Sequence, residues 1–153
     1  MRILGLDLGD KRIGLALSDP MGWTAQGLEV IASKGSIEAD ITKIKEYVER
    51  YEVEKVIIGL PLNMDGSSGP RAEKARAFAA RLGKRLKITV EMTDERLTTV
   101  AAQKLLIEAD LSRSKRRKVI DKMAAVLILQ SYLDLKATKE NKINTELSQN
   151  GNS

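Results

Sequence analysis

The sequence predicts one α/β domain with a five-stranded mixed sheet and helices on both of its faces. Three observations carry this prediction. The length of 153 residues, 42% of them hydrophobic, suits a single globular domain. Three apolar segments separated by short turns open the chain, as in an antiparallel meander. Helix-like and strand-like segments then alternate, which implies parallel strands joined by right-handed crossovers, in the order βββαβαβαα.

The first three strands are expected at residues 2–8, 12–18 and 28–32. Leucines alternate along the first segment, and isoleucine and leucine alternate along the second. Gly9 and Asp10 form the turn between them, because both residues favour tight turns. The third segment, LEVIA, is short and follows a turn-like loop around Pro20.

The remainder of the domain alternates helices and strands. Ser36 is expected to cap a helix over residues 37–51, whose first turn is acidic and whose apolar residues recur at helical spacing. Pro70 suits the first position of a second helix that ends near Leu86. The other expected segments are a strand at 55–60, a loop at 61–69, a strand at 88–93, a helix from Thr98 or Thr99 to about Ala109, a basic connection at 110–118 and an apolar helix over 119–135.

The composition becomes polar from Lys136 onward. We therefore expect one folded domain over residues 1–136 and a disordered tail over 137–153.

Two residue types are missing, and their absence excludes several chemistries. The chain has no cysteine, which rules out disulfides, zinc–thiolate sites and a thiol nucleophile. It has no histidine, which removes imidazole bases and Ser/His/Asp hydrolysis. Only five residues are aromatic, so a base-stacking platform for single strands is not expected. Carboxylates, Lys, Arg, hydroxyl groups and oxygen-bound metals remain for ionic chemistry.

The charge favours a polyanionic partner without proving one. The 26 Lys and Arg residues exceed the 21 Asp and Glu residues, a net charge of +5 that could equally serve solubility. No segment reaches the roughly 18 to 20 apolar residues of a membrane span. The first residues include Asp7 and Asp10 and lack a cleavage site, so they do not resemble a signal peptide. We expect a cytoplasmic protein that does not bind membranes.

Asp7 is an anomaly, because it lies within an otherwise apolar strand. Removing a carboxylate from water costs several kcal/mol unless it is paired or bound to a metal. Gly9 and Gly14 lie close by and leave room for a ligand. A functional role is favoured, and the alternative is a structural ion pair with Arg2 or Arg12.

Two further acidic positions accompany Asp7. Asp121 begins a stripe of small and apolar residues on the last helix, although an acid there also suits the helix dipole. Asp94 and Glu95 follow the strand at 88–93, at the sheet edge where ligands bind in open α/β folds. The alternation of that strand does not decide which of the two acids faces the site, and both could belong to a solvated loop.

Together these acids predict a metal site. Three carboxylates without histidine suit hard cations such as Mg²⁺ or Mn²⁺. Two such ions, roughly 3.5–4 Å apart, can activate water and stabilise the leaving oxygen of a phosphodiester. Metal-dependent phosphodiester hydrolysis is therefore the favoured chemistry.

Basic and amide side chains near these acids are candidates for nucleic-acid contact. Five of the six residues from 113 to 118 are basic, and they precede the helix that carries Asp121. The loop from Gly59 to Gly66 leaves the strand at 55–60 at the same sheet edge, and a plain turn is an equally good interpretation. The complete set of candidates is Arg12, Asn63, Arg96, Arg113, Lys115, Arg116, Arg117 and Lys118.

Four segments resemble a known family. They are DLGDKRIGLALSDP (7–20), VIIGLPLNMDGSSGPRAEKARAF (56–78), DERLTT (94–99) and DKMAAVLILQSYL (121–133). In order and spacing they are similar to the YqgF family of small bacterial proteins in the RNase H-like superfamily. Members are described as Holliday junction resolvases and as nucleases that mature the 5′ end of pre-16S ribosomal RNA. The resemblance covers about residues 1–135.

The resemblance implies an RNase H-like sheet with the strand order 3-2-1-4-5. It also implies that Asp7, Glu95 and Asp121 are the catalytic and metal-binding acids, with Glu95 in preference to Asp94. Mg²⁺ or Mn²⁺, in a two-metal site, would be the cofactor. The implied partners are structured RNA, such as ribosome-associated pre-rRNA, or branched DNA. The oligomeric state is left open, with a homodimer as one alternative.

Two other functions compete with the nuclease hypothesis. One is a non-catalytic RNA-binding or ribosome-binding module that keeps the acids for structure. The other is a phosphotransferase of the actin-like fold, which would need a second domain that 153 residues cannot supply. RNA and DNA substrates are not distinguished, because metals and phosphate contacts serve both.

Overall fold

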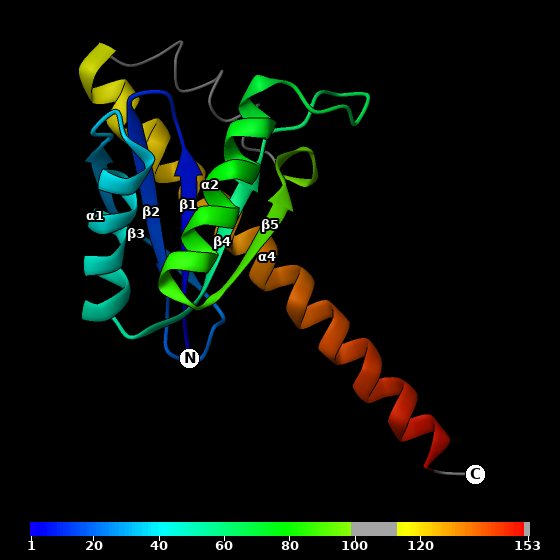
Figure 1. Cartoon of the computed structure of the whole chain (residues 1–153). Coiled ribbons are helices and arrows are strands. Elements are labelled where there is room, and N and C mark those ends of the chain that lie inside the picture. The colour runs from blue at the N-terminus through cyan, green and yellow to red at the C-terminus, as the bar shows by residue number, and fades with distance from the viewer. Residues whose placement is uncertain (99–112, 152–153) are drawn as a thin grey trace.

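A computed structural model describes residues 1–98 and 113–151, with side chains described for residues 1–98 and 120–151 (Figure 1). Its centre is a five-stranded sheet in the order β3-β2-β1-β4-β5. The strands are β1 (Arg2–Leu8), β2 (Arg12–Ser18), β3 (Ala25–Ala32), β4 (Val53–Leu60) and β5 (Thr89–Asp94). The predicted strand order is confirmed.

The strand pairings follow the chain order closely. β1, β2 and β3 form the antiparallel meander, while β1 and β4, and β4 and β5, pair in parallel. β3 begins at Ala25 rather than at residue 28, because Ala25 to Gly27 pair with the last residues of β2. The carboxyl ends of β1, β4 and β5 therefore meet at one edge of the sheet, as the parallel pairing requires.

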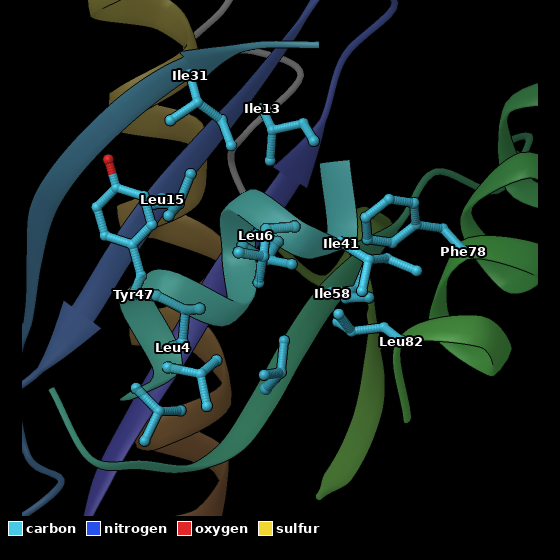
Figure 2. Packing of buried hydrophobic residues seen from close by; sticks show 14 of the residues in the cluster. Leu4, Leu6, Ile13, Leu15, Ile31, Ile41, Tyr47, Ile58, Phe78 and Leu82 are labelled. Carbon is cyan, nitrogen blue, oxygen red and sulfur yellow. The ribbon is translucent and has the colours of Figure 1, made fainter. Parts of the chain in front are cut away.

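Helices cover both faces of the sheet. On one face, leucines such as Leu4 and Leu6 of β1 pack with α1 (Ile37–Arg50) and α2 (Pro70–Leu86) in a large hydrophobic cluster (Figure 2). On the other face, Ile3 and Ile57 pack against α4 (Arg113–Asn150). The alternation of side chains along each strand separates the two clusters.

The ends of α1 and α2 use the residues that the sequence indicates. The Ser36 hydroxyl accepts a hydrogen bond from the Ala39 N–H and caps α1. Pro70 is the first residue of α2, and Lys87 ends that helix in a left-handed conformation. These caps confirm the predicted helix boundaries to within one residue.

The last helix corrects two expectations. Residues 113–118 are helical rather than part of a connecting segment, and the helix continues to Asn150 rather than giving way to a disordered tail. No glycine or proline interrupts residues 113–150, so nothing in the sequence stops the helix before Gly151. Every side chain from 137 to 150 is exposed, and this part of α4 extends away from the sheet (Figure 1).

Two other expectations concern this half of the chain. The helix expected from Thr98 or Thr99 to about Ala109 lies almost wholly outside the described residues, and the proposed domain boundary at 136 stays a prediction. Over residues 1–98 and 113–151, no helix combines the length and the apolar character needed to cross a membrane.

Candidate active site

A pocket of about 370 Å³ opens at the carboxyl ends of β1 and β4. Its lining includes the three acids that the family resemblance singles out, each carried by a different element. The lining residues are Asp7, Leu8, Gly9, Asp10, Lys11, Arg12, Pro61, Arg71, Glu95, Ile120 and Asp121. Segments far apart in the sequence thus meet at one place.

Asp7 is held rigidly in the middle of the sheet. It lies near the end of β1, directly opposite Gly14 of β2, and its side chain is only 4% exposed. It shares the face of the sheet that packs against α4, because Ile3 and Gly5 of the same parity contact that helix. An ion pair with Arg2 is excluded, since Arg2 lies at the opposite end of β1 with its guanidinium 6.0 Å from the Tyr51 ring centroid.

Asp121 is brought to the same point by the close approach of α4. A Cβ atom built on Gly14 would lie 2.1 Å from the Asp121 carbonyl oxygen. A Cβ built on Gly5 would lie 2.7 Å from the Leu129 Cβ, two turns farther along the helix. Only glycine at these positions allows the helix backbone to rest on β1 and β2.

Glu95, and not Asp94, contributes the third acid of the pocket. Asp94 ends β5 and accepts hydrogen bonds from Arg96, with 2.7 Å between Asp94 Oδ2 and Arg96 Nη2. These bonds hold the pKa of Asp94 below its usual value. Glu95 begins a short 3₁₀ turn, and its carboxylate lies over Gly59 of β4. The structure therefore separates two neighbouring acids into one paired with arginine and one that lines the pocket.

The chemistry of these three side chains suits a hard divalent cation, because all are carboxylates and none is accompanied by histidine or cysteine. The three carboxylates lie farther apart than the ligands of a closed metal site. Among the side chains described, those of residues 1–98 and 120–151, no three acidic groups converge closely enough to form a ligand group. Like charges that share a pocket repel one another, so a cation would be needed to draw these carboxylates together.

Basic residues form the rim of the pocket. The turn between β1 and β2 is closed by a hydrogen bond from the Gly9 N–H to the Arg12 carbonyl, which places Lys11 and Arg12 in the lining. Arg71, in the first turn of α2, lies 3.4 Å from Asp10. Both side chains of this ion pair are at least 70% exposed, so the pair is weak and can exchange with a phosphate.

Lys11 and Arg71 line the pocket although the sequence did not predict them there. The signal for Arg71 was present, because Pro70 places the next residue in the first turn of a helix that starts at the functional edge of the sheet. Lys11 lies between Asp10 and the predicted contact Arg12, and was not distinguished from an ordinary turn residue.

Two predicted phosphate contacts instead stabilise the loop after β4. The Asn63 side chain donates to Ser67 Oγ, and its backbone N–H donates to the Ser67 carbonyl. Arg96 pairs with Asp94 and donates to the Met64 carbonyl. Neither side chain lines the pocket. The candidates at 113, 115, 116, 117 and 118 lie on the first turns of α4, but their side chains fall outside the described residues.

Comparison with known proteins agrees with this architecture. Residues 1–135 match the model of the family described as RuvX, Holliday junction resolvase. The chain belongs to this family. It is the family called YqgF above, so the resemblance found in the sequence is confirmed.

Several RuvX relatives are closely similar. A "Putative pre-16S rRNA nuclease" of Pelotomaculum thermopropionicum is 69% identical over 134 residues, which cover 88% of this chain and 87% of the relative. A protein of the same name from Heliobacterium modesticaldum is 58% identical over 137 residues, covering 90% and 91% of the two chains. These names identify a family of nucleases.

The fold is also found in a solved resolvase. Thermus thermophilus RuvC, solved in complex with a Holliday junction substrate, superposes with a TM-score of 0.57. The match covers 89% of this chain and 96% of the other, with 14% sequence identity. This likeness supports the RNase H-like fold of the RuvX chain.

Proposed function

We propose that this RuvX-family chain is a divalent-metal-dependent nuclease that hydrolyses phosphodiester bonds in structured nucleic acid, with precursor 16S rRNA as its substrate. The observation that supports it best is the pocket itself. Its lining combines three carboxylates from β1, the turn after β5 and α4 with the three cationic residues Lys11, Arg12 and Arg71. This combination suits a phosphate diester that must be held while it is attacked.

The three acids of the pocket would hold the metal together. Asp7, Glu95 and Asp121 would be the ligands, and Asp7 is the most rigid of them because β2 and β4 flank its strand. When bound, Mg²⁺ or Mn²⁺ would lower the pKa of a ligated water and would offset the negative charge that develops on the leaving oxygen. Neither role needs an imidazole base, in agreement with a chain that contains no histidine.

The cationic rim would hold the substrate. Lys11, Arg12 and Arg71 can contact phosphate oxygens on either side of the scissile bond, and they carry no information about base sequence. Asp7 is only 4% exposed, so its carboxylate lies in a medium of lower dielectric constant than bulk water, where electrostatic contacts are stronger. Positioning and charge are therefore the chain's own contributions to hydrolysis.

The choice of substrate rests on the relatives. The two relatives described above carry the name pre-16S rRNA nuclease, which favours RNA. The description of the family model names the Holliday junction, which makes a four-way DNA junction the second candidate. A direct comparison of the two substrates decides between them.

The test is cleavage of a precursor 16S RNA fragment and of a four-way DNA junction, side by side, in Mg²⁺, in Mn²⁺ and in EDTA. We expect the RNA to be cut only when a divalent ion is present. Asp7→Asn should abolish cleavage, because the amide keeps the shape of the side chain and removes its charge. Metal-independent cleavage, or a fully active Asp7→Asn variant, would refute the proposed site.

Asp40→Asn is the matched control. Asp40 is also buried, at 6% exposure, but it lies in the first turn of α1, where its carboxylate accepts hydrogen bonds from Ser33 Oγ and the Lys34 N–H. Neutralising it should lower the melting temperature and leave cleavage by the folded fraction intact. The contrast separates loss of a buried charge in general from loss of the charge in the pocket.

A further inference from the structure

On the face of the sheet that α1 and α2 cover, positive charge is concentrated on α2. Among its 17 residues α2 carries six basic side chains and one acidic side chain, a net charge of +5. That equals the net charge of the whole 153-residue chain. The neighbouring helix α1 carries four acidic and three basic residues in 14 positions. The excess positive charge is thus a property of α2 and not of helices on this face in general.

The basic residues of α2 are arranged along its exposed side. The buried positions are Ala72, Ala75, Phe78 and Leu82, which face the sheet. Arg71, Lys74, Arg81 and Lys84 recur three, seven and three residues apart, and all four are exposed. At 1.5 Å per residue, the ridge from residue 71 to residue 84 is about 20 Å long.

This ridge is continuous with the pocket. Arg71 is both its first member and part of the pocket lining. α2 starts beside the ends of β1 and β4 and runs from there across the face of the sheet (Figure 1). A chain of phosphates that leaves the pocket over Arg71 therefore meets the remaining basic residues of α2 in order.

Local acids balance only part of this charge. Arg81 and Arg85 share a single partner, Glu38, at 3.7 Å and 3.0 Å. Arg71 pairs with Asp10, and both of those side chains are highly exposed. Exposed pairs of this kind contribute little to stability, so they do not account for six basic residues on one short helix.

We propose that α2 is a phosphate-binding track for a double-helical RNA arm that extends from the active-site pocket. The proposal rests on the proposed nuclease function and adds the surface that holds the substrate outside the pocket. At about 3.4 Å of duplex axis per base pair, the 20 Å ridge matches the axial length of roughly six base pairs. Contacts of this type position the arm and do not read its sequence.

The test uses two double variants with equal loss of charge. Lys74→Gln with Lys84→Gln removes two lysines from the ridge of α2, and Lys43→Gln with Lys45→Gln removes two from α1. The probe is a fluorescently labelled RNA hairpin that carries the cleavage site beside a stem, of about twelve base pairs in one form and about three in the other. Binding is measured in EDTA at 50 mM and 200 mM salt, so that no cleavage occurs.

We expect the parent and the α1 variant to behave alike. For the long stem, losing two phosphate contacts lowers the salt slope of binding by about 1.4 to 1.8. The parent should then lose about 7- to 12-fold more affinity than the α2 variant between 50 mM and 200 mM salt. For the short stem, which does not reach Lys84, the difference between parent and α2 variant should be much smaller.

Three results would overturn the proposal. The first is an equal change in the salt slope of binding in the α1 and α2 variants. The second is an equal change in that slope with long and short stems. The third is an unchanged slope in the α2 variant. A far-ultraviolet circular dichroism spectrum checks that both variants keep their helices. Failure of the proposed nuclease function is a separate result, since it shows as absence of cleavage by the parent in Mg²⁺ and Mn²⁺ whatever the binding data give.

Discussion

Gly14→Ala tests whether the backbone contact beneath α4 positions the proposed active-site acids. The added Cβ would lie 2.1 Å from the Asp121 carbonyl oxygen, whereas tolerable contacts begin at 3.0 Å and ordinary ones at 3.4 Å. The helix must therefore move by about 0.9 to 1.3 Å at the residue that carries the acid. Asp7 lies directly opposite Gly14, so this movement changes the separation of Asp7 and Asp121.

The displacement should affect catalysis more than folding. Overpacking of this kind costs about 1–3 kcal/mol, and each kcal/mol lowers the melting temperature of a chain of this size by about 2–4 °C. A misplacement of 1 Å among reacting groups can lower the rate about 100-fold. We expect a folded variant with a melting temperature a few degrees lower, a much lower kcat and a higher Mg²⁺ concentration at half-maximal activity.

Gly27→Ala is the control for that variant. Gly27 of β3 approaches the residue next to Asp121, and its added Cβ would meet the Lys122 side chain at 2.6 Å. A lysine side chain can rotate away, so activity should stay within about twofold of the parent. If Gly14→Ala cleaved at the parent rate with the parent's metal requirement, the close approach of α4 would not position the acids.

Three further variants test other contacts. Asp94→Asn should lower stability at neutral pH by up to about 1 kcal/mol, because the ion pair with Arg96 is partly exposed. Since Arg96 lowers the pKa of Asp94, this stabilisation is present above about pH 4 and is lost as pH falls through the lower folded-state pKa. The free energies of unfolding of parent and variant in urea should therefore converge at acidic pH. Tyr132→Phe removes the hydroxyl that accepts a hydrogen bond from Lys55 Nζ at 2.9 Å. The change should cost about 0.5–1.5 kcal/mol in the same melts at pH 7, well below the raised pKa of Lys55. Asp121→Ala removes one proposed metal ligand and one repelling charge, so in EDTA its melting temperature should equal or exceed that of the parent. A hundredfold excess of Mg²⁺ over Kd should stabilise the parent by about 2.7 kcal/mol and the variant by much less. An equal Mg²⁺-induced shift in both proteins would remove Asp121 from the metal site.

The sheet could be predicted from the sequence because its signals are local. Alternating apolar residues in β1 and β2, the capping residue Ser36 and the helix-starting Pro70 each act within a few residues of their own position. The extent of α4 could not be predicted in the same way. Polar composition after Lys136 indicates that no core forms there, but it does not prevent a helix that is already nucleated from continuing.

The pocket was predicted less completely, because its members depend on tertiary contacts. The alternation of β5 left Asp94 and Glu95 equivalent, and only the family resemblance favoured Glu95. In the structure Asp94 is paired with Arg96, whereas Glu95 lines the pocket. Lys11 and Arg71 come together from a hairpin turn and a helix start about 60 residues apart in sequence, which no local pattern can show.

The glycines account for the lengths of the three proposed metal ligands, a glutamate at position 95 and aspartates at positions 7 and 121. Glu95 follows β5, which is separated from β1 by β4, so its backbone begins two strands away from Asp7, or about 10 Å at the usual strand spacing. Its longer side chain crosses β4 at Gly59, where a Cβ would lie 2.7 Å from the Glu95 carboxylate oxygen and 2.6 Å from Ile128 Cδ1. Any side chain at position 59 would block that path. Asp121 needs no such reach, because Gly14 already brings its backbone onto the strand beside Asp7. The lengths of the three acids thus follow from how closely each backbone can approach the pocket.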